Sequence, residues 1–481
     1  MGTENTPLDL SLVRILLLAT YELGRQPFGL ASPAAWLRRE GFDVTTVDTS
    51  RTSVDDDQIS AASLVAVHLQ MHTATRLAEP LLARVRRVNP AAHICGYGLY
   101  APLNEAWLRE QGVATVLGGE FEEALVTLAA ELARGAGSPL RTAGSVLQGL
   151  DGQSGGGRVP KLRFIQPDRS GLPPLESYAS VQMPDGTRRV SGATEASRGC
   201  KHLCRHCPIV PVYQGEFRVV PVDVVMADVA AQVSAGAAHV SFGDPDFLNG
   251  PAHAARVVER FAAEHAGVSY DVTIKIEHLL RHANLLPLLR RTGCLFVTSA
   301  VESVDDAVLA KLAKGHTRAD FGRVVSLCRD AGLTLSPTFV SFTPWTTVEG
   351  YLDLIDTIDA LNLVEHVAPI QLAIRLLVTA RSALLDLPDI RAAVDPFDAR
   401  SLTWPWRHHD ARVDALQRDV IRTVGEHVQG HRSEAFESIA ALAARAAGGS
   451  PRLPRLGGPA RMVPSVTEPW YCCAEPDPEL I

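Results

Sequence analysis

Three cysteines stand close together on one short segment of the chain. Residues 198–208 read Arg-Gly-Cys-Lys-His-Leu-Cys-Arg-His-Cys-Pro, which places Cys200, Cys204 and Cys207 in a Cys-x3-Cys-x2-Cys spacing. Iron–sulfur clusters are held by thiolates, and three thiolates can hold three irons of a cubane [4Fe–4S] cluster. The fourth iron then lacks a protein ligand, so such a cluster can bind and transform another molecule.

The same loop is open to two other interpretations. Zinc prefers a tetrahedral set of thiolates and imidazoles, and either His202 or His206 could complete such a set. The three thiols could also be unrelated buried side chains, although chance seldom produces so tight a spacing. The cluster is the interpretation that the spacing favours.

The composition is that of a globular chain with a sizeable core. Of 481 residues, 46% are apolar and 21% are charged, which is enough for two or three domains. The net charge of -8, without a long basic run, argues against a nucleic-acid partner. The chain start lacks the basic segment of a secretory signal, and the apolar run 15–19 is too short to cross a membrane. We therefore expect a cytoplasmic protein without a membrane partner.

The elements that must position the loop begin with an alternating strand–helix series. Helical patterns separate strand-like runs at residues 13–20, 43–48, 64–71, 93–100 and 115–118. Short turns between these elements predict a parallel sheet covered on both faces, so residues 1–135 should form a flavodoxin-like, doubly wound α/β domain. The next residues are rich in glycine, proline and serine, and we place a linker at 136–189.

A second alternating series follows, and the cysteine loop comes directly after its first strand. Strand-like runs occur at residues 193–197, 239–242, 268–275, 295–300, 334–342 and 369–377. Six strand–helix repeats predict a (βα)6 partial TIM barrel over residues 190–390, with reactive side chains at the carboxyl ends of the strands. Residues 391–481 are predicted to form a small helical C-terminal region that ends in a proline-rich tail.

The cysteine loop and its place after the first barrel strand resemble the radical S-adenosylmethionine (SAM) superfamily, over residues 190–390. The resemblance implies that the open iron chelates the amino and carboxylate groups of SAM. One electron would then split the sulfonium into methionine and a 5′-deoxyadenosyl radical. It also implies an electron donor such as a flavodoxin or ferredoxin and a small-molecule substrate. One departure is His206, where the family commonly has an aromatic residue near the adenine, although histidine also offers a flat ring.

Several strand ends match positions at which this family contacts SAM. Gly243, Asp244 and Asp246 follow the second strand, where the family often has a Gly-Gly-Glu segment that holds the methionine amine. The resemblance implies close backbone approach at the glycine and two carboxylates that accept from the ammonium; a helix-capping turn is the alternative. Lys275 and Glu302 end the third and fourth strands. By the same resemblance they would hold the carboxylate and ribose of SAM, although Lys275 could equally form a surface ion pair.

The first domain resembles the cobalamin-binding domain of cobalamin-dependent radical SAM enzymes, over residues 10–135. Many cobalamin proteins supply a histidine to cobalt from an Asp-x-His-x-x-Gly segment, but residues 20–29 after the first strand contain no histidine. Radical SAM members can bind cobalamin without that ligand, so cobalamin stays an open cofactor. A scaffold or substrate lid is the alternative, since a doubly wound fold does not by itself imply its ligand.

The tail carries a second group of cysteines, in the sequence Cys-Cys-Ala-Glu-Pro at residues 472–476. It resembles the CUAEP/CCAEP-tail radical SAM family, in which some members have selenocysteine at the second position, here Cys473. The resemblance suggests a redox group, a nucleophile or a ligand for a soft metal, with Cys472 as its partner. The alternative is a tail whose thiols have no function.

These features together predict an enzyme that cleaves SAM reductively at the cluster and acts on a small molecule. Two reaction classes stay open: methyl transfer through cobalamin, and radical rearrangement or carbon–heteroatom bond formation without it. A non-enzymatic alternative is an iron–sulfur or zinc protein whose tail dithiol binds or senses a soft metal without SAM turnover.

Overall fold

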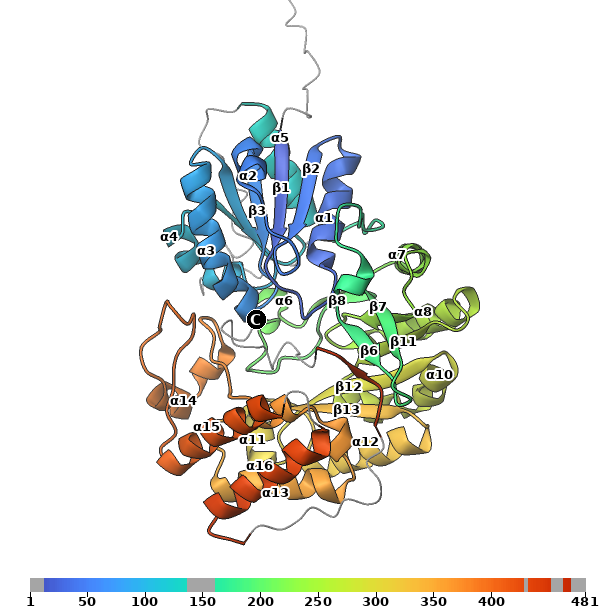
Figure 1. The fold of residues 1–481 in the computed structure, drawn as a ribbon, viewed down its shortest axis with the longest axis vertical. Helices are drawn as coiled ribbons and strands as arrows, with labels where there is room; N and C mark the ends of the chain where they lie inside the picture. Colours follow the sequence, from blue (N-terminus) through green and yellow to red (C-terminus); the bar gives the residue numbers. More distant parts are fainter. Residues whose placement is uncertain (1–12, 136–160, 428–430, 451–461, 469–481) are drawn as a thin grey trace, which may run out of the picture.

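The computed structural model describes residues 13–135, 161–427, 431–450 and 462–468. Two α/β units are stacked along the long axis of the molecule, and a helical region lies beside the second unit (Figure 1). Among these residues, no helix is long and apolar enough to span a membrane.

The first unit is the predicted flavodoxin-like sheet. Its five strands are all parallel and lie in the order β2-β1-β3-β4-β5, which is the flavodoxin order. The strands are β1 (Arg14–Ala19), β2 (Asp43–Asp48), β3 (Leu64–His68), β4 (His93–Tyr97) and β5 (Thr115–Leu117). Helices α1 (Phe28–Arg39) and α5 (Glu122–Ala133) cover one face, and α2 (Asp56–Ala61), α3 (His72–Val88) and α4 (Glu105–Glu110) cover the other. The strands are buried on both faces because helices pack on each.

The second unit is a curled sheet with the order β13-β12-β11-β10-β7-β6-β14. Five neighbouring strands are parallel, namely β7 (Arg188–Thr194), β10 (His239–Phe242), β11 (Ser269–Thr273), β12 (Cys294–Glu302) and β13 (Thr334–Phe339). Two antiparallel strands that the sequence pattern did not predict, β6 (Ser180–Gln182) and β14 (Ser465–Val466), extend one edge. The predicted linker is therefore shorter than 136–189, because its last residues pair into this sheet.

Two predicted barrel strands differ in the structure. The first runs from Arg188 to Thr194 rather than over 193–197, and a separate short strand, β8 (Ser197–Gly199), pairs with β9 (Phe217–Val219). The sixth, predicted at 369–377, is replaced by a 3-10 helix, η7 (Pro369–Leu372), and one isolated bridge between Phe342 and Arg375. Proline has no N–H to donate to a ladder. Gln371 instead contacts β13 by accepting from the Phe339 N–H at its side chain, 3.3 Å away.

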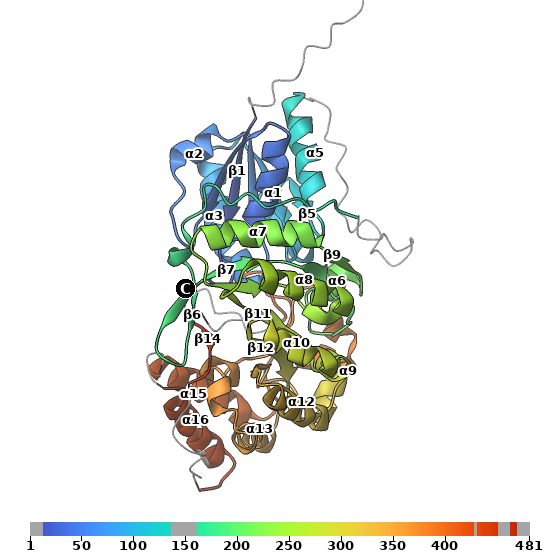
Figure 2. The same ribbon diagram turned by 90° about the vertical axis from the view of Figure 1, so that its right-hand side faces the viewer.

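Most of the remaining helices lie around the curled sheet (Figure 2), whereas the short helix Val210–Tyr213 packs in the core of the first unit. They are α6 (Val210–Tyr213), α7 (Val222–Ser234), α8 (Pro251–Glu264), α9 (Ile276–Arg281), α10 (Leu286–Arg291), α11 (Asp306–Lys311), α12 (Arg318–Asp330), α13 (Val348–Ala360), α14 (Pro388–Ala393), α15 (Ala411–Glu426) and α16 (Arg432–Ala446). Shorter 3-10 turns are η2 (Pro102–Asn104), η3 (Leu175–Ser177), η4 (Phe247–Asn249), η5 (Ala283–Leu285), η6 (Val364–His366) and η8 (Ala383–Asp386). The C-terminal helices α15 and α16 contribute side chains such as Val420 and Phe436 to the barrel's own core. The predicted helical region is thus present but shares that core.

Candidate functional site

The cysteine loop begins where β8 ends. Cys200, Cys204 and Cys207 form no disulfide with any described residue, and Cys204 is buried. Gly199 before the loop has φ of +75°, and a Cβ there would lie 2.5 Å from the carbonyl oxygen of Glu216, so only glycine fits. The Cys200 N–H donates to that same oxygen at 3.1 Å, which ties the loop to the β8–β9 hairpin.

The loop is held at its other end as well. The Arg205 N–H donates to the Leu312 carbonyl at 3.0 Å, and the Cys207 N–H donates to the Cys204 carbonyl at 3.1 Å. Burial raises the pKa of the Cys200 thiol to about 11. A cationic partner such as a metal is therefore needed to hold this sulfur as a thiolate.

Asp244 supports the turn that carries the loop. Its carboxylate is buried and accepts from the Ala196 N–H at 2.9 Å and from the hydroxyl of Ser197. Burial raises the pKa of Asp244 to about 7. Gly243 lies beside it, and its N–H donates to the Thr194 carbonyl at 2.8 Å. Both residues line a cavity, but the oxygens of Asp244 are already engaged with the turn, so its expected contact with an ammonium stays a prediction.

A buried cluster of charges lies at the end of β12. Glu302 accepts from His206 Nε2 at 3.1 Å through Oε1, and Lys314 Nζ lies 3.3 Å from the same oxygen. Burial opposes ionisation of Glu302, but the Lys314 charge and the His206 bond outweigh it and lower its pKa to about 2. Lys275 is also buried, and its Nζ lies 3.6 Å from Glu277 Oε2. His206 therefore links the cysteine loop to the buried ion pair of Glu302 and Lys314. The residues around His206 in the sequence did not indicate this contact.

Arg198, directly before Gly199, joins the two α/β units. Its guanidinium donates to Glu120 at 2.9 Å, to Glu122 at 2.7 Å and to Glu195 at 2.8 Å. Burial opposes the charge of Arg198, but the carboxylates outweigh it and raise its pKa. Glu120 and Glu122 belong to the first unit, so the strand leading into the cysteine loop is anchored across the interface. The only indication of this anchoring role in the sequence is that Arg198 lies next to the cysteine loop.

Two adjoining cavities lie between the units. Their volumes are about 150 Å³ and about 70 Å³. The lining of the larger one comes from both units and includes Glu22, Leu23, Gln70, Leu99, Glu195, Cys207, Pro208, Gly243, Thr273 and Ala300. Apart from Cys207 and Pro208 of the cysteine loop, these residues lie at, near or just after the carboxyl ends of β1, β3, β4, β7, β10, β11 and β12, so the two sheets point their carboxyl ends at a common space. Ligands of such sheets bind at this edge.

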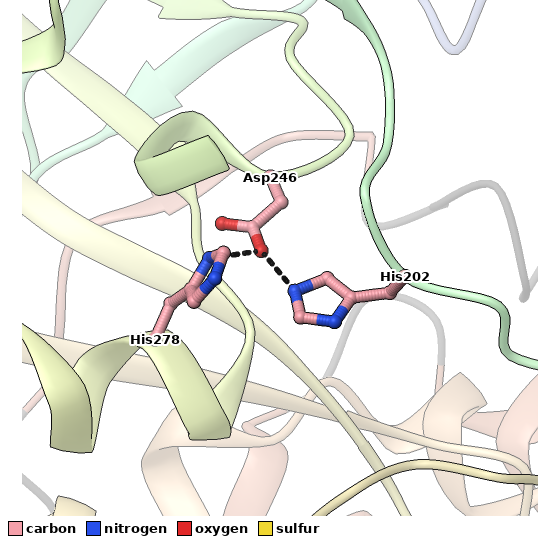
Figure 3. Close-up of side chains that lie close together, drawn as sticks. All are labelled: His202, Asp246 and His278. Carbon is pink, nitrogen blue, oxygen red and sulfur yellow. Dashed lines mark hydrogen bonds and ion pairs between the residues drawn. The ribbon is translucent and has the colours of Figure 1, made fainter. Parts of the chain in front are cut away.

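Asp246 lies beside the loop, between two imidazoles (Figure 3). Its Oδ2 is 3.1 Å from His202 Nε2 and 2.7 Å from His278 Nδ1, and its Oδ1 accepts from the Leu248 N–H at 3.2 Å. Burial opposes ionisation, but the two imidazoles outweigh it and lower the pKa of Asp246. Sequence reasoning missed His278, which stands three residues after Lys275 at the end of the third strand.

The tail cysteines Cys472 and Cys473 lie outside the described residues. The last described residue, Glu468, accepts from the Tyr21 hydroxyl at 2.7 Å and lies 3.7 Å from Arg51. Gly24 packs against it so closely that a Cβ would lie 1.6 Å from its Oε2. The chain therefore reaches residue 468 beside the loop after β1, which lines the cavity between the units.

Residues 194–359 match the family model described as the radical SAM superfamily. The chain is 27% identical over 188 residues to a tRNA-2-methylthio-N(6)-dimethylallyladenosine synthase of Chlorobium luteolum, covering 35% of this chain and 39% of that protein. It is 24% identical over 160 residues to the hopanoid C-3 methylase of Methylococcus capsulatus, covering 33% of this chain and 30% of that protein. The matched part thus spans less than half the length of these curated relatives.

Two solved structures share the fold. The cobalamin-dependent SAM radical enzyme OxsB with aqua-cobalamin bound aligns with a TM-score of 0.63 and 13% identity, over 87% of this chain and 68% of that one. The radical SAM methyltransferase TsrM from Kitasatospora setae, with cobalamin and a [4Fe–4S] cluster bound, aligns with a TM-score of 0.54 and 18% identity, over 73% of this chain and 70% of that one. The predicted α/β architecture of sheet and partial barrel is confirmed.

Proposed function

We propose that this chain, which carries a radical SAM domain over residues 194–359, is an enzyme that cleaves SAM reductively and acts on a small molecule. The observation that carries the proposal is one tethered loop with three cysteines outside any disulfide among the described residues, of which Cys207 lines the cavity between the units. Three thiolates would leave one iron of a [4Fe–4S] cluster open. A bound cluster would supply the electron that splits the sulfonium of SAM, beside a space for the substrate.

Buried charges at the strand ends would hold SAM. Its amino-acid part carries an ammonium and a carboxylate, so the site needs an anionic and a cationic group. Glu302 is the proposed anion, and Lys275 and Lys314 are the proposed cations, all three buried in the barrel. Gly243 lines the cavity and offers no side chain to obstruct the ligand. His206 would connect the cysteine loop to this group through its bond to Glu302.

Asp246 was predicted to contact SAM, but we propose a different role for it. Its Oδ2 already lies at 3.1 Å and 2.7 Å from two imidazole nitrogens, which leaves this oxygen little room for an ammonium. The contacts of the two loop histidines also argue against a zinc ion bound by the cysteine loop. His202 lies against Asp246 and His206 against Glu302, so each imidazole has another partner than the thiols.

Cobalamin is the cofactor that we propose for the first unit. OxsB and TsrM, which share the fold, both bind it. Here the carboxyl ends of the flavodoxin-like strands open onto the cavity that Cys207 also lines, which would bring cobalt and SAM to one space. Methyl transfer and radical rearrangement or carbon–heteroatom bond formation both stay open as reactions. Cobalt retained after anaerobic reconstitution with cobalamin and gel filtration would support the assignment, and a cobalt-free protein would contradict it.

The direct test of the activity is SAM cleavage. Full-length protein, reconstituted anaerobically with iron and sulfide and then reduced, is incubated with SAM, and 5′-deoxyadenosine is measured. We expect the product from the wild-type protein and none from Cys204→Ala, because a two-thiolate loop cannot hold the cluster. Cys328→Ala is the matched control, since Cys328 is a buried free thiol of α12 outside the loop. No product from wild-type protein with a full cluster would favour the non-enzymatic alternative.

The tail pair is proposed to act on the substrate rather than on SAM. Glu468 holds the end of the described chain beside the cavity-lining loop, and four further residues lead to Cys472. An extended chain gains about 3.3–3.6 Å per residue, so about 13–14 Å of reach is available. Cys473→Ser should therefore retain 5′-deoxyadenosine formation without substrate. Loss of that product in a variant with intact cluster iron would contradict this division of roles.

A further inference from the structure

His202, Asp246 and His278 come together from three separate elements next to the cysteine loop. His202 belongs to the loop, Asp246 to the turn after β10, and His278 to α9. Their donor atoms all lie within 4.8 Å of one another, and Asp246 and His278 are buried. Figure 3 shows the carboxylate between the two rings, with Oδ2 directed at both.

Asp246 and His278 make a close, buried contact. Asp246 Oδ2 and His278 Nδ1 lie 2.7 Å apart, within ion-pair distance, although this nitrogen has no hydrogen-bond partner of acceptable geometry among the described residues. His278 is only 3% exposed, so its ring lies away from bulk solvent. A positive charge between the two atoms, whether a proton or a metal ion, holds them this close. His202 directs a third donor atom at the same carboxylate oxygen, which a metal ion can use and a single proton cannot.

The surroundings of His202 agree with a metal ligand. Its Nε2 is directed at the cluster of donors, while its Nδ1 lies 3.6 Å from Glu277 Oε2. Histidines that bind metals usually offer their outer nitrogen to a carboxylate, which fixes the ring. Lys275 stands 3.6 Å from the same Glu277 oxygen and balances that charge. Arg281 lies 2.7 Å from the other Glu277 oxygen, so a dication would meet one negative ligand, Asp246, while the charge of Glu277 is already compensated.

We propose that His202, Asp246 and His278 bind one divalent first-row transition ion, with zinc as the preferred species, separately from the three thiolates. Two imidazoles and a carboxylate form a mixed nitrogen and oxygen set that zinc accepts at about 2.0–2.2 Å, with an open position for water or another oxygen ligand. The ion would tie the cysteine loop to the ends of β10 and β11. This site does not depend on the proposed SAM chemistry.

The test counts metals in the full-length protein. Cluster-loaded protein is dialysed anaerobically against zinc, and zinc and iron per chain are measured. We expect one zinc per chain in addition to the cluster iron. His278→Ala and the near-isosteric Asp246→Asn should lose this zinc and keep the iron. His282→Ala is the matched control, because its ring is 5.6 Å from that of His278 on the same helix end but outside the group, and it should keep both metals.

A second measurement identifies the ligands without any variant. Zinc-edge X-ray absorption of the loaded protein should show nitrogen or oxygen neighbours at about 2.0–2.1 Å and no sulfur near 2.3 Å. The double variant Cys472→Ser/Cys473→Ser should bind the same zinc. The proposal is overturned by sulfur ligation, by zinc that survives His278→Ala, by zinc lost with the tail thiols, or by a cluster-loaded protein that binds none.

Discussion

Glu302 occupies an unusual position for a charged residue. It is 1% exposed and has φ of +69°, in the left-handed region that side chains other than glycine seldom adopt. Such strain persists only where the surroundings hold the residue firmly, and it gathers at functional sites. His206 and Lys314 supply that hold through Oε1, while Oε2 has no hydrogen-bond partner among the described residues. The free oxygen is the atom that we expect to face a cationic ligand.

Glu302→Gln tests this expectation because it removes one negative charge and keeps the size of the side chain. Loss of the anion should weaken SAM binding about 10- to 100-fold, since hydrogen bonds to charged groups contribute about 1.5–3 kcal/mol. SAM affinity of the cluster-loaded protein is measured by equilibrium dialysis, with iron content as the check on the cluster. Glu259→Gln removes the same charge from the exposed surface of α8 and should leave affinity unchanged. Equal affinities for all three proteins would refute the role of Glu302.

The sequence anticipated the residues of the loop but not most of their partners. Cys200, Cys204 and Cys207 are neighbours in sequence, so their spacing alone predicts a cluster, and their role as its ligands stays a prediction. His278 and Asp246 are separated by 32 positions and belong to different strand–helix repeats. The parallel pairing of β10 and β11 brings their carboxyl ends together, and no local pattern shows which side chains meet there.

At the scale of elements, the turn between β7 and β8 depends on a carboxyl group behind it. Asp244 accepts from the backbone and the hydroxyl of this turn, in a site where burial raises its pKa to about 7. The folded chain therefore holds the proton of Asp244 more tightly than the unfolded chain does. This contribution to stability is complete below the ordinary pKa near 3.8 and is lost as the pH rises through about 7.

Asp244→Asn should remove this pH dependence. The free energy of unfolding of the wild-type protein should fall between pH 5 and pH 8 relative to that of the variant, by on the order of 1 kcal/mol or more. Urea unfolding at the two pH values measures the difference, with Asp330→Asn on the exposed end of α12 as control. The same pH response in wild type and Asp244→Asn would show that this carboxyl does not govern the turn.

Most strands were predictable, and the exceptions have physical reasons. Buried parallel strands read as apolar runs, so β1 and β3 stood out. The run at 369–377 looks similar, but Pro369 starts a 3-10 turn and only Arg375 pairs with the sheet. Strands β6 and β14 have three and two residues, too few for a periodic pattern, and they pair across a sequence distance of more than 280 residues.

At the scale of the whole molecule, the interface between the units could not be predicted. The flavodoxin-like class of the first unit was predictable from its strand–helix pattern. The sequence pattern does not show, however, how the sheets of the two units face each other. Arg198 contributes to the relative orientation of the two units. It lies two residues before Cys200 and binds Glu120 and Glu122 of the first unit. The position of the cysteine loop is thereby tied to the first unit, and the cavity between the sheets carries Cys207 on its wall.

We propose that a cluster on this loop keeps one iron open for SAM. Electron paramagnetic resonance of the reduced, cluster-loaded, full-length protein tests it most directly, with spectra recorded before and after addition of SAM. We predict that SAM shifts the g values of the cluster, because its amino and carboxylate groups become ligands of the open iron, and that Cys204→Ala gives no such cluster signal. Identical spectra with and without saturating SAM, in protein with full iron content, would show that SAM does not bind the cluster.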